Sequence, residues 1–177
     1  MTSNIKKLTF SGILLAVGFI LHQIAPAGVG GVTFDFMLAM VFIIMMINKD
    51  FKTAMIAGIA AGVLTALTTK FPGGQIPNMI DKPVTVLVVY GFLKCGRNIP
   101  QILRIGLIGF IGTLISGSVF LSTASILVGL PASFIILFYS VVIPTAIGNT
   151  IVSVFLYKIV LSSIQKVNPS FMEQLEG

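Results

Sequence analysis

The chain has 177 residues, of which 56% are hydrophobic and only 9% are charged, and its mean hydropathy is +1.07. A soluble domain carries about 25% charged residues, so this chain has too little charge to cover a surface in water. The composition predicts an integral membrane protein and excludes a disordered chain and a nucleic-acid-binding domain. The net charge of +6 then records membrane topology rather than a polyanionic partner.

An all-α architecture with six transmembrane helices is predicted from the apolar segments between charges, glycines and prolines. A helix needs about 20 mostly apolar residues to cross the hydrocarbon core. The membrane domain is expected over residues 1–161, and a short polar cytoplasmic tail over residues 162–177. In chain order the predicted spans are residues 8–25, 36–47, 53–69 and 79–93, a fifth within 102–127 and a sixth within 133–156.

The basic residues set the expected orientation, because cytoplasmic loops of membrane proteins carry an excess of lysine and arginine. With both termini in the cytoplasm, only Lys70 and Lys82 of the eleven basic residues lie on the outer side. We therefore predict a multi-pass cell-membrane protein that is embedded in the lipid bilayer and has cytoplasmic N- and C-termini.

Small residues recur every fourth position in two of the spans. In the first span they are Gly12 and Ala16. Residues of this size and spacing let helix backbones approach closely. Most such stripes pack the protein's own helices, whereas the stripe on the first span could instead dock a partner subunit. The longer stripe, in the third span, consists of Ala54, Gly58, Gly62 and Ala66.

Polar residues gather on the predicted outer side of the membrane. A polar group near the membrane costs free energy unless it meets a partner or water, so this set predicts a water-accessible ligand site. Tyr139 alone fits an aromatic belt equally well, and Asn149 fits a hydrogen bond to a neighbouring helix. The set consists of His22, Asp35, Gln75, Asn78, Asp81, Lys82 and Tyr139, with Asn149 deeper in the sixth span.

The other members of this set also have structural interpretations. His22 can be an interfacial histidine, and Asp35 can cap the second span. Asn78 and Asp81 are three residues apart and resemble a capping box for the fourth span. Lys82 can extend to the membrane interface or pair with Asp81.

The stretch of residues 70–83 contains three prolines, a Gly-Gly pair and the dipeptide Asp81-Lys82. Such backbone is not expected to continue a helix, and irregular backbone at membrane depth is tolerated where it lines a cavity. The next helix would direct its positive N-terminal end at that cavity, which favours a carboxylate. A neighbouring acid could hold an ammonium group, so a zwitterionic ligand is chemically reasonable.

The segment from Ala66 to Pro83, ALTTKFPGGQIPNMIDKP, closely resembles the hallmark stretch of the bacterial tryptophan-transport protein family. Shorter matches extend the resemblance over roughly residues 8–157. They include Leu21-His22, the run from Asp35 to Met40, and Gly129-Leu130-Pro131. One departure is Phe34, where the family is expected to have proline. The family is similar to the six-helix, substrate-binding S components of energy-coupling-factor (ECF) transporters.

The resemblance implies high-affinity uptake of L-tryptophan across the bacterial cell membrane, with the binding site near the outer face. It also implies a partnership with an ECF transmembrane coupling subunit and two ATPase subunits, for which Gly12 and Ala16 are the docking candidates. The chain has no Walker A sequence, so ATP-driven energy would come from partners. Whether the protein uses an ECF module or works alone is left open.

The resemblance and the polar residues together suggest roles in a tryptophan site. Lys82 or nearby backbone N–H groups would receive the carboxylate, and Asp81 or Asp35 would receive the ammonium. Gln75 or Asn78 would accept a hydrogen bond from the indole N–H. The aromatic face that suits an indole has two candidates: Phe71 and Tyr139.

Three other functions compete with tryptophan transport. An S component could bind another small molecule, such as a vitamin. An enzyme would need a nucleophile with a base, an acid pair or metal ligands, and Cys95 on the inner side is far from His22, so we expect no catalytic residues. The single cysteine and single histidine make a poor metal set, so no metal or cofactor is expected. An assembly subunit without a ligand is disfavoured by the polar residues.

Overall fold

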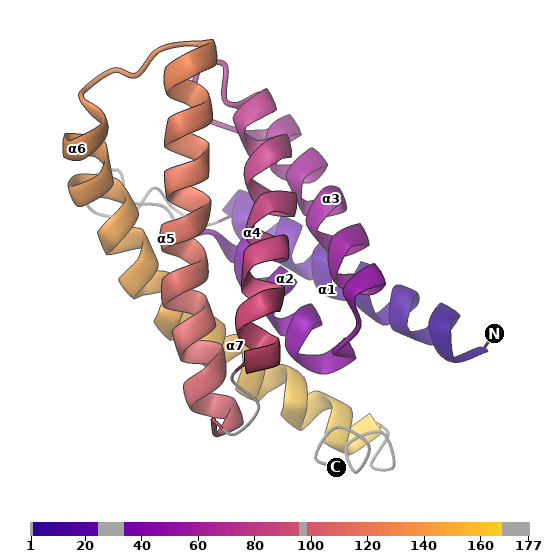
Figure 1. Cartoon of the computed structure of the whole chain (residues 1–177). Helices are drawn as coiled ribbons and strands as arrows, with labels where there is room; N and C mark the ends of the chain where they lie inside the picture. Colours follow the sequence, from indigo (N-terminus) through magenta and orange to yellow (C-terminus); the bar gives the residue numbers. More distant parts are fainter. Residues whose placement is uncertain (1, 25–33, 96–98, 168–177) are drawn as a thin grey trace.

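The computed structural model describes residues 2–24, 34–95 and 99–167, and every regular element within them is helical (Figure 1). The last three elements form one continuous helix, so the predicted six-helix, all-α architecture is confirmed. The elements are α1 (Thr2–Ile24), α2 (Phe36–Asn48), α3 (Phe51–Thr68), α4 (Gln75–Cys95), α5 (Gln101–Leu127), α6 (Phe134–Leu137), the π-helical turn η2 (Phe138–Val142) and α7 (Ile143–Val167).

Five of the described helices are long and apolar enough to cross a membrane, namely α1, α3, α4, α5 and the helix from α6 to α7. The shorter one is α2, whose 13 residues extend about 20 Å at a rise of about 1.5 Å each. Its residues from Met37 to Asn48 are all buried, because α1, α3, α5 and α7 pack around it. The centre of the core is therefore α2, covered by protein rather than by lipid.

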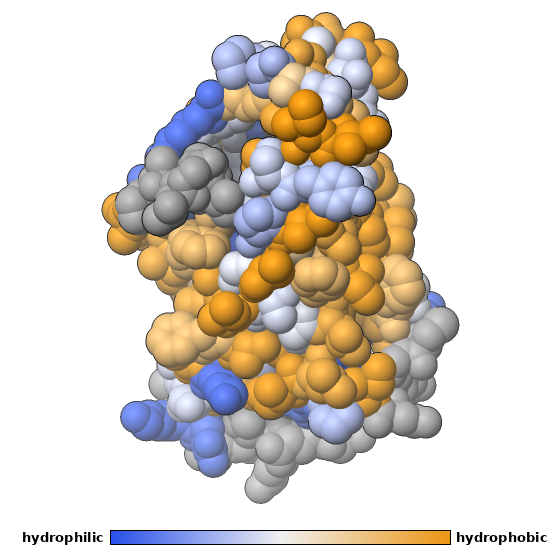
Figure 2. All heavy atoms as spheres, turned by 90° about the vertical axis from the view of Figure 1, so that its left-hand side faces the viewer, coloured by the Kyte–Doolittle hydropathy of each residue, from blue (hydrophilic) through white to orange (hydrophobic). Residues whose placement is uncertain are grey.

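The outward faces of the long helices are strongly apolar. Leu67, Ile126 and Ile151 expose 77%, 83% and 67% of their surface, respectively. Figure 2 shows a broad apolar band over one side of the molecule, with hydrophilic residues near its lower end and at its upper left. An exposed apolar surface of this extent is what a protein presents to lipid rather than to water.

The two stripes of small residues have different environments. In α3, Gly58 and Gly62 are buried against α4, and a methyl group at Gly62 would lie 3.1 Å from the backbone oxygen of Asn78. This stripe lets two of the protein's own helices approach closely. On α1, Gly12 and Ala16 are exposed, and a methyl group at Gly12 would meet nothing within 4 Å. Their role in docking a partner stays a prediction.

The proline-rich stretch is more helical than expected. Only residues 69–74 form an irregular turn, and α4 begins at Gln75 rather than at residue 79. Pro77 fits the first turn, where a backbone N–H has no partner within the helix. Pro83 lies inside α4, so its turn lacks one backbone hydrogen bond. The expectation that this stretch cannot be helical is wrong from Gln75 onward.

The sixth helix contains one irregular turn and extends beyond the predicted boundary of the domain. The N–H of Ile143 donates to the carbonyl of Phe138, five residues back, in a π-helical turn. Pro144 follows directly and has no N–H to donate, which favours such a local widening. The helix runs on to Val167, past residue 161. Residues 168–177 of the predicted tail lie outside the described residues.

Candidate functional site

Three charged side chains meet where the start of α2 faces the second turn of α4, and we call Asp35, Asp81 and Lys82 the charged cluster. The Nζ of Lys82 donates to Oδ2 of Asp35 at 2.6 Å and to Oδ2 of Asp81 at 3.0 Å. The side chains of Lys82 and Asp81 are only 3% and 2% exposed, whereas that of Asp35 is 19% exposed. Asp35 therefore marks the side from which a ligand could reach the cluster.

Ser116 of α5 holds the Asp81 carboxylate in place. Its hydroxyl donates to Oδ2 of Asp81 at 2.6 Å, and Nζ of Lys82 lies 3.4 Å from the same hydroxyl oxygen. Oδ2 of Asp81 thus receives two hydrogen bonds. The other oxygen, Oδ1, is buried and has no partner among the described residues.

Asp35 is fixed from two directions. Its Oδ1 accepts from the backbone N–H of Leu38 at 2.9 Å, which caps α2, and its own N–H donates to Oδ1 of Asn149 at 2.9 Å. Asn149 in turn donates from Nδ2 to the hydroxyl of Thr113 at 3.2 Å and is fully buried. Asp35 is therefore both a helix cap and an ion-pair partner, and Asn149 connects α7 to α2 and α5.

The charged cluster has charges of both signs, but they do not balance. Two carboxyl groups face one ammonium group, so one negative charge is in excess when both carboxyl groups are ionised. Burying charges is costly unless each is paired and hydrogen-bonded. Such an arrangement can receive a ligand that brings its own positive and negative groups.

The two predicted amide residues lie on the first turn of α4, outside the charged cluster. Asn78 is buried and donates from Nδ2 to the carbonyl of Gly74 at 2.9 Å. Gln75 is exposed at the start of the helix. Because both Asn78 and Asp81 lie within α4, the capping-box interpretation of this pair is wrong.

His22 and Tyr139 differ in their distance from the cluster. His22, near the end of α1, is half-buried and interacts electrostatically with Asp35, although its Nδ1 has no hydrogen-bond partner among the described residues. Tyr139 is 67% exposed in the π-helical turn. The structure thus brings His22 to the edge of the cluster and leaves Tyr139 on the outer surface of its helix.

An aromatic pair lies one helical turn from Ser116, which contacts the charged cluster. The rings of Phe71 and Phe120 meet edge to face, with centroids 5.4 Å apart and planes at 86°. Phe120 is four residues after Ser116 on α5, so the two side chains share a helix face about 6 Å apart along the axis. We call Phe71 and Phe120 the aromatic pair.

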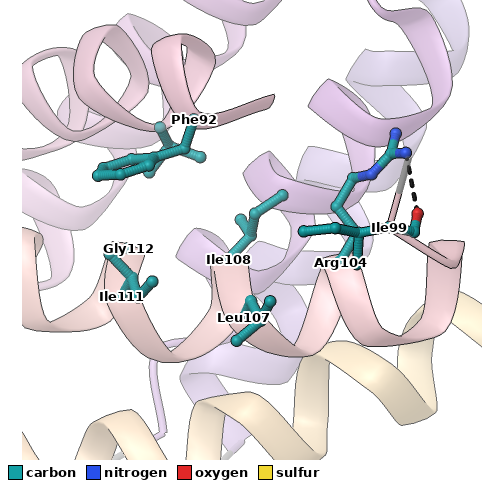
Figure 3. A pocket seen from close by; sticks show the side chains of 8 residues that line it. Phe92, Ile99, Arg104, Leu107, Ile108, Ile111 and Gly112 are labelled. Atoms are coloured by element: carbon teal, nitrogen blue, oxygen red, sulfur yellow. Dashed lines mark hydrogen bonds between the residues drawn. The ribbon is translucent and has the colours of Figure 1, made fainter. Parts of the chain in front are cut away.

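A separate apolar cavity of about 320 Å³ lies between α4 and α5, toward the other end of the bundle. Figure 3 shows Phe92 entering from α4, most of the other side chains coming from α5, and Arg104 at one end, where it donates to the carbonyl of Ile99 at 3.0 Å. Phe92 is about 16 Å from Asp81 along α4, at about 1.5 Å per residue. The lining residues are Val89, Phe92, Ile99, Arg104, Leu107, Ile108, Ile111 and Gly112.

Sequence reasoning missed the hydrogen-bonding roles of Ser116 and Thr113. Both are buried in α5, and their spacing of three residues places them on one helix face. That spacing of hydroxyl residues within an apolar span was the available signal.

Comparisons with known proteins agree on one family. The family model described as "Tryptophan transporter TrpP" matches residues 4–165. A Clostridium perfringens protein named "Probable tryptophan transport protein" is 42% identical, covering 94% of this chain and 97% of that protein. Proteins of the same name from Clostridium acetobutylicum and Bacillus subtilis are 45% and 39% identical, covering 94% and 95% of this chain and 98% and 96% of their own.

No solved structure matches the chain. The family model extends over nearly all of the described helices, and each of the three relatives is matched over almost its whole length. The chain is a multi-pass membrane protein of a bacterial transporter family and not an enzyme. It belongs to the tryptophan transporter TrpP family.

Proposed function

We propose that the protein takes up L-tryptophan with high affinity and binds it at the charged cluster, with the aromatic pair beside the indole. The observation that carries this proposal is the buried ammonium of Lys82, which is shared by two carboxylates. Two phenylalanine rings in edge-to-face contact lie one helical turn from Ser116, the hydrogen-bond donor to one of those carboxylates. A free amino acid with an aromatic side chain has the matching groups. The relatives' names support tryptophan as that amino acid.

Each part of tryptophan has a counterpart in the site. The carboxylate pairs with Lys82 through a charge-assisted hydrogen bond. The ammonium pairs with Asp35, which is the most exposed member of the cluster. The indole packs against Phe71 and Phe120, because aromatic rings favour offset or edge-to-face contacts with other rings.

The site is proposed to open to the outer face of the membrane. The turn of residues 69–74, which leads into the cluster, contains one basic residue, Lys70. Basic residues concentrate at the opposite end of the bundle, which the positive-inside rule assigns to the cytoplasm. Those at the opposite end include Lys49, Lys52, Lys94 and Arg104.

The energy source is proposed to be an ECF module, made of a transmembrane coupling subunit and two ATPase subunits. The exposed Gly12 and Ala16 on α1 are the proposed contact. Replacing both with leucine would then abolish co-purification with the coupling subunit and leave tryptophan binding in detergent unchanged. Co-purification of the doubly substituted protein at the wild-type level would exclude this contact.

Binding by the purified protein tests the substrate. The chain contains no tryptophan and three tyrosines, so the fluorescence of a bound indole can be followed directly. We expect saturable binding that L-tryptophan competes for, with tyrosine and phenylalanine weaker and vitamins inactive. Displacement by a vitamin, or no binding by folded protein, would favour the alternative of an S component for another small molecule.

A further inference from the structure

The charged cluster contains two carboxylates and one ammonium group, and Asp81 is the carboxylate with fewer hydrogen-bonded oxygens. Asp35 has hydrogen-bond donors on both of its oxygens. Asp81 is buried, and its Oδ1 has no partner among the described residues. Thr85, one turn further along α4, is fully buried, and its hydroxyl also lacks a partner there. Oδ1 of Asp81 and the hydroxyl of Thr85 therefore lie on the same side of α4, and neither has a hydrogen-bond partner among the described residues.

A zwitterionic substrate would increase this imbalance at Asp81. An ammonium group has three hydrogens to donate, and those of Lys82 now serve Asp35, Asp81 and Ser116. The contact with Asp81, at 3.0 Å, is longer than the contact with Asp35, at 2.6 Å. A carboxylate that binds Lys82 would accordingly take the place of the two longer contacts, those with Ser116 and Asp81, rather than the contact with Asp35.

The substrate itself cannot restore the balance, because a zwitterion adds no net charge. Its ammonium group would pair with the more exposed Asp35. Asp81 would keep the hydrogen bond from Ser116 but lose its counter-ion. An unpaired carboxylate at this depth is strongly disfavoured.

Resting on the proposed function, we propose that Asp81 takes up one proton from the outer solution when tryptophan binds. The proton forms an O–H bond at the carboxylate, and no other covalent bond changes. The charged cluster with its substrate is then electrically neutral. Tryptophan binding and proton binding are thereby linked at one residue.

The other titratable groups around Asp81 are few. The titratable neighbour within α4 is Lys82, and the one at the start of α2 is Asp35. The face of α3 toward α4 has none, α5 presents Ser116, and α7 contributes the neutral Asn149. From α1, His22 interacts with Asp35, and an imidazole is a second group that can hold a proton. His22 is therefore the competing proton acceptor that the experiment must separate from Asp81.

Direct proton counting tests the proposal. The purified protein is mixed with L-tryptophan in weakly buffered detergent solution containing a pH indicator, from pH 5 to 8, first without sodium and then with it. We expect up to one proton taken up per tryptophan bound, and a Kd that rises by up to about tenfold per pH unit within the pH range in which the proton is taken up. Binding without proton uptake, or binding that requires sodium instead, would overturn the proposal. Absence of tryptophan binding at every pH would refute the proposed function itself.

Four variants assign the proton. Asp81→Asn should take up no proton and bind with a Kd that does not vary with pH. Ser116→Ala removes a donor to the ionised carboxylate, so the range of proton uptake should move to higher pH. His22→Gln and Asp50→Asn should still take up one proton; Asp50 is the matched control because it caps α3 through the N–H of Thr53, away from the cluster. Uptake that persists in Asp81→Asn or disappears in His22→Gln contradicts the assignment.

Discussion

Replacing Lys82 with methionine should weaken tryptophan binding and destabilise the fold. The substitution keeps a long apolar stem but removes the ammonium that joins two carboxylates from different parts of the chain. Lys82 is 3% exposed, so solvent screens these pairs little, and removing one partner of a buried ion pair costs about 3–5 kcal/mol. A hydrogen bond between charged groups contributes about 1.5–3 kcal/mol, so losing the contact to the substrate carboxylate should raise Kd about 10-fold to 100-fold.

The assay is indole fluorescence titration together with thermal unfolding of the same purified sample. Lys70→Met is the matched control, because Lys70 is exposed in the turn before α4, and it should leave Kd and unfolding temperature unchanged. Lys82→Arg keeps the charge and tests binding in a protein that retains a cation at this position. A Lys82→Met protein with the Kd and unfolding temperature of the wild type would refute the role of the charged cluster.

The remaining predictions concern packing and the aromatic pair. Phe71→Ala should weaken tryptophan binding by up to about tenfold, whereas Phe92→Ala, in the separate cavity, should leave Kd unchanged; titration of both distinguishes the two locations. Asn149→Ala should lower stability by about 1–3 kcal/mol, because it leaves the N–H of Asp35 and the hydroxyl of Thr113 without their partner. Gly62→Val should destabilise the α3–α4 contact. At Gly91 an added methyl group would meet nothing within 4 Å, so Gly91→Ala should be neutral or stabilising by about 0.5–1 kcal/mol. Thermal unfolding measures these changes.

Composition and charge were enough to predict a helical membrane protein with six helices. The bounds of α2 were predicted to within one residue, since residues 36–47 were expected and the helix is Phe36–Asn48, but its place in the core was not predictable in this way. The run from Phe36 to Asn48 is apolar on all sides, and such a run fits a lipid-facing span as well as a helix covered by other helices. Only the packing of α1, α3, α5 and α7 distinguishes the two cases.

For the candidate site, the sequence predicted which residue types to consider but not their contacts. Asp35, Asp81 and Lys82 were among the candidates, and in the structure Lys82 donates hydrogen bonds to both carboxylates. Gln75 and Tyr139 were equally plausible from their position but are exposed. Helix rotation decides this difference, and a strongly apolar span gives a weak rotational signal because both faces carry similar residues.

The prediction that the proline-rich stretch is not helical failed because it used only local helix preferences. Two of its prolines lie within α4, one in the first turn and one at Pro83. A proline inside a helix is normally unfavourable, but tertiary contacts of α4 with α3 and α5 compensate for it. Asp81 and Lys82 therefore lie on a rigid helix next to the interrupted hydrogen bond, and not in a loop.

The most direct test of the central claim is a calorimetric titration of the purified protein with L-tryptophan, tryptamine and indole-3-propionate. Tryptamine lacks the carboxylate that Lys82 receives, and indole-3-propionate lacks the ammonium that Asp35 receives. If the charged cluster recognises both groups, each analogue should bind at least about tenfold more weakly than L-tryptophan. Equal affinity for L-tryptophan and for either analogue would contradict recognition of the amino acid by the charged cluster.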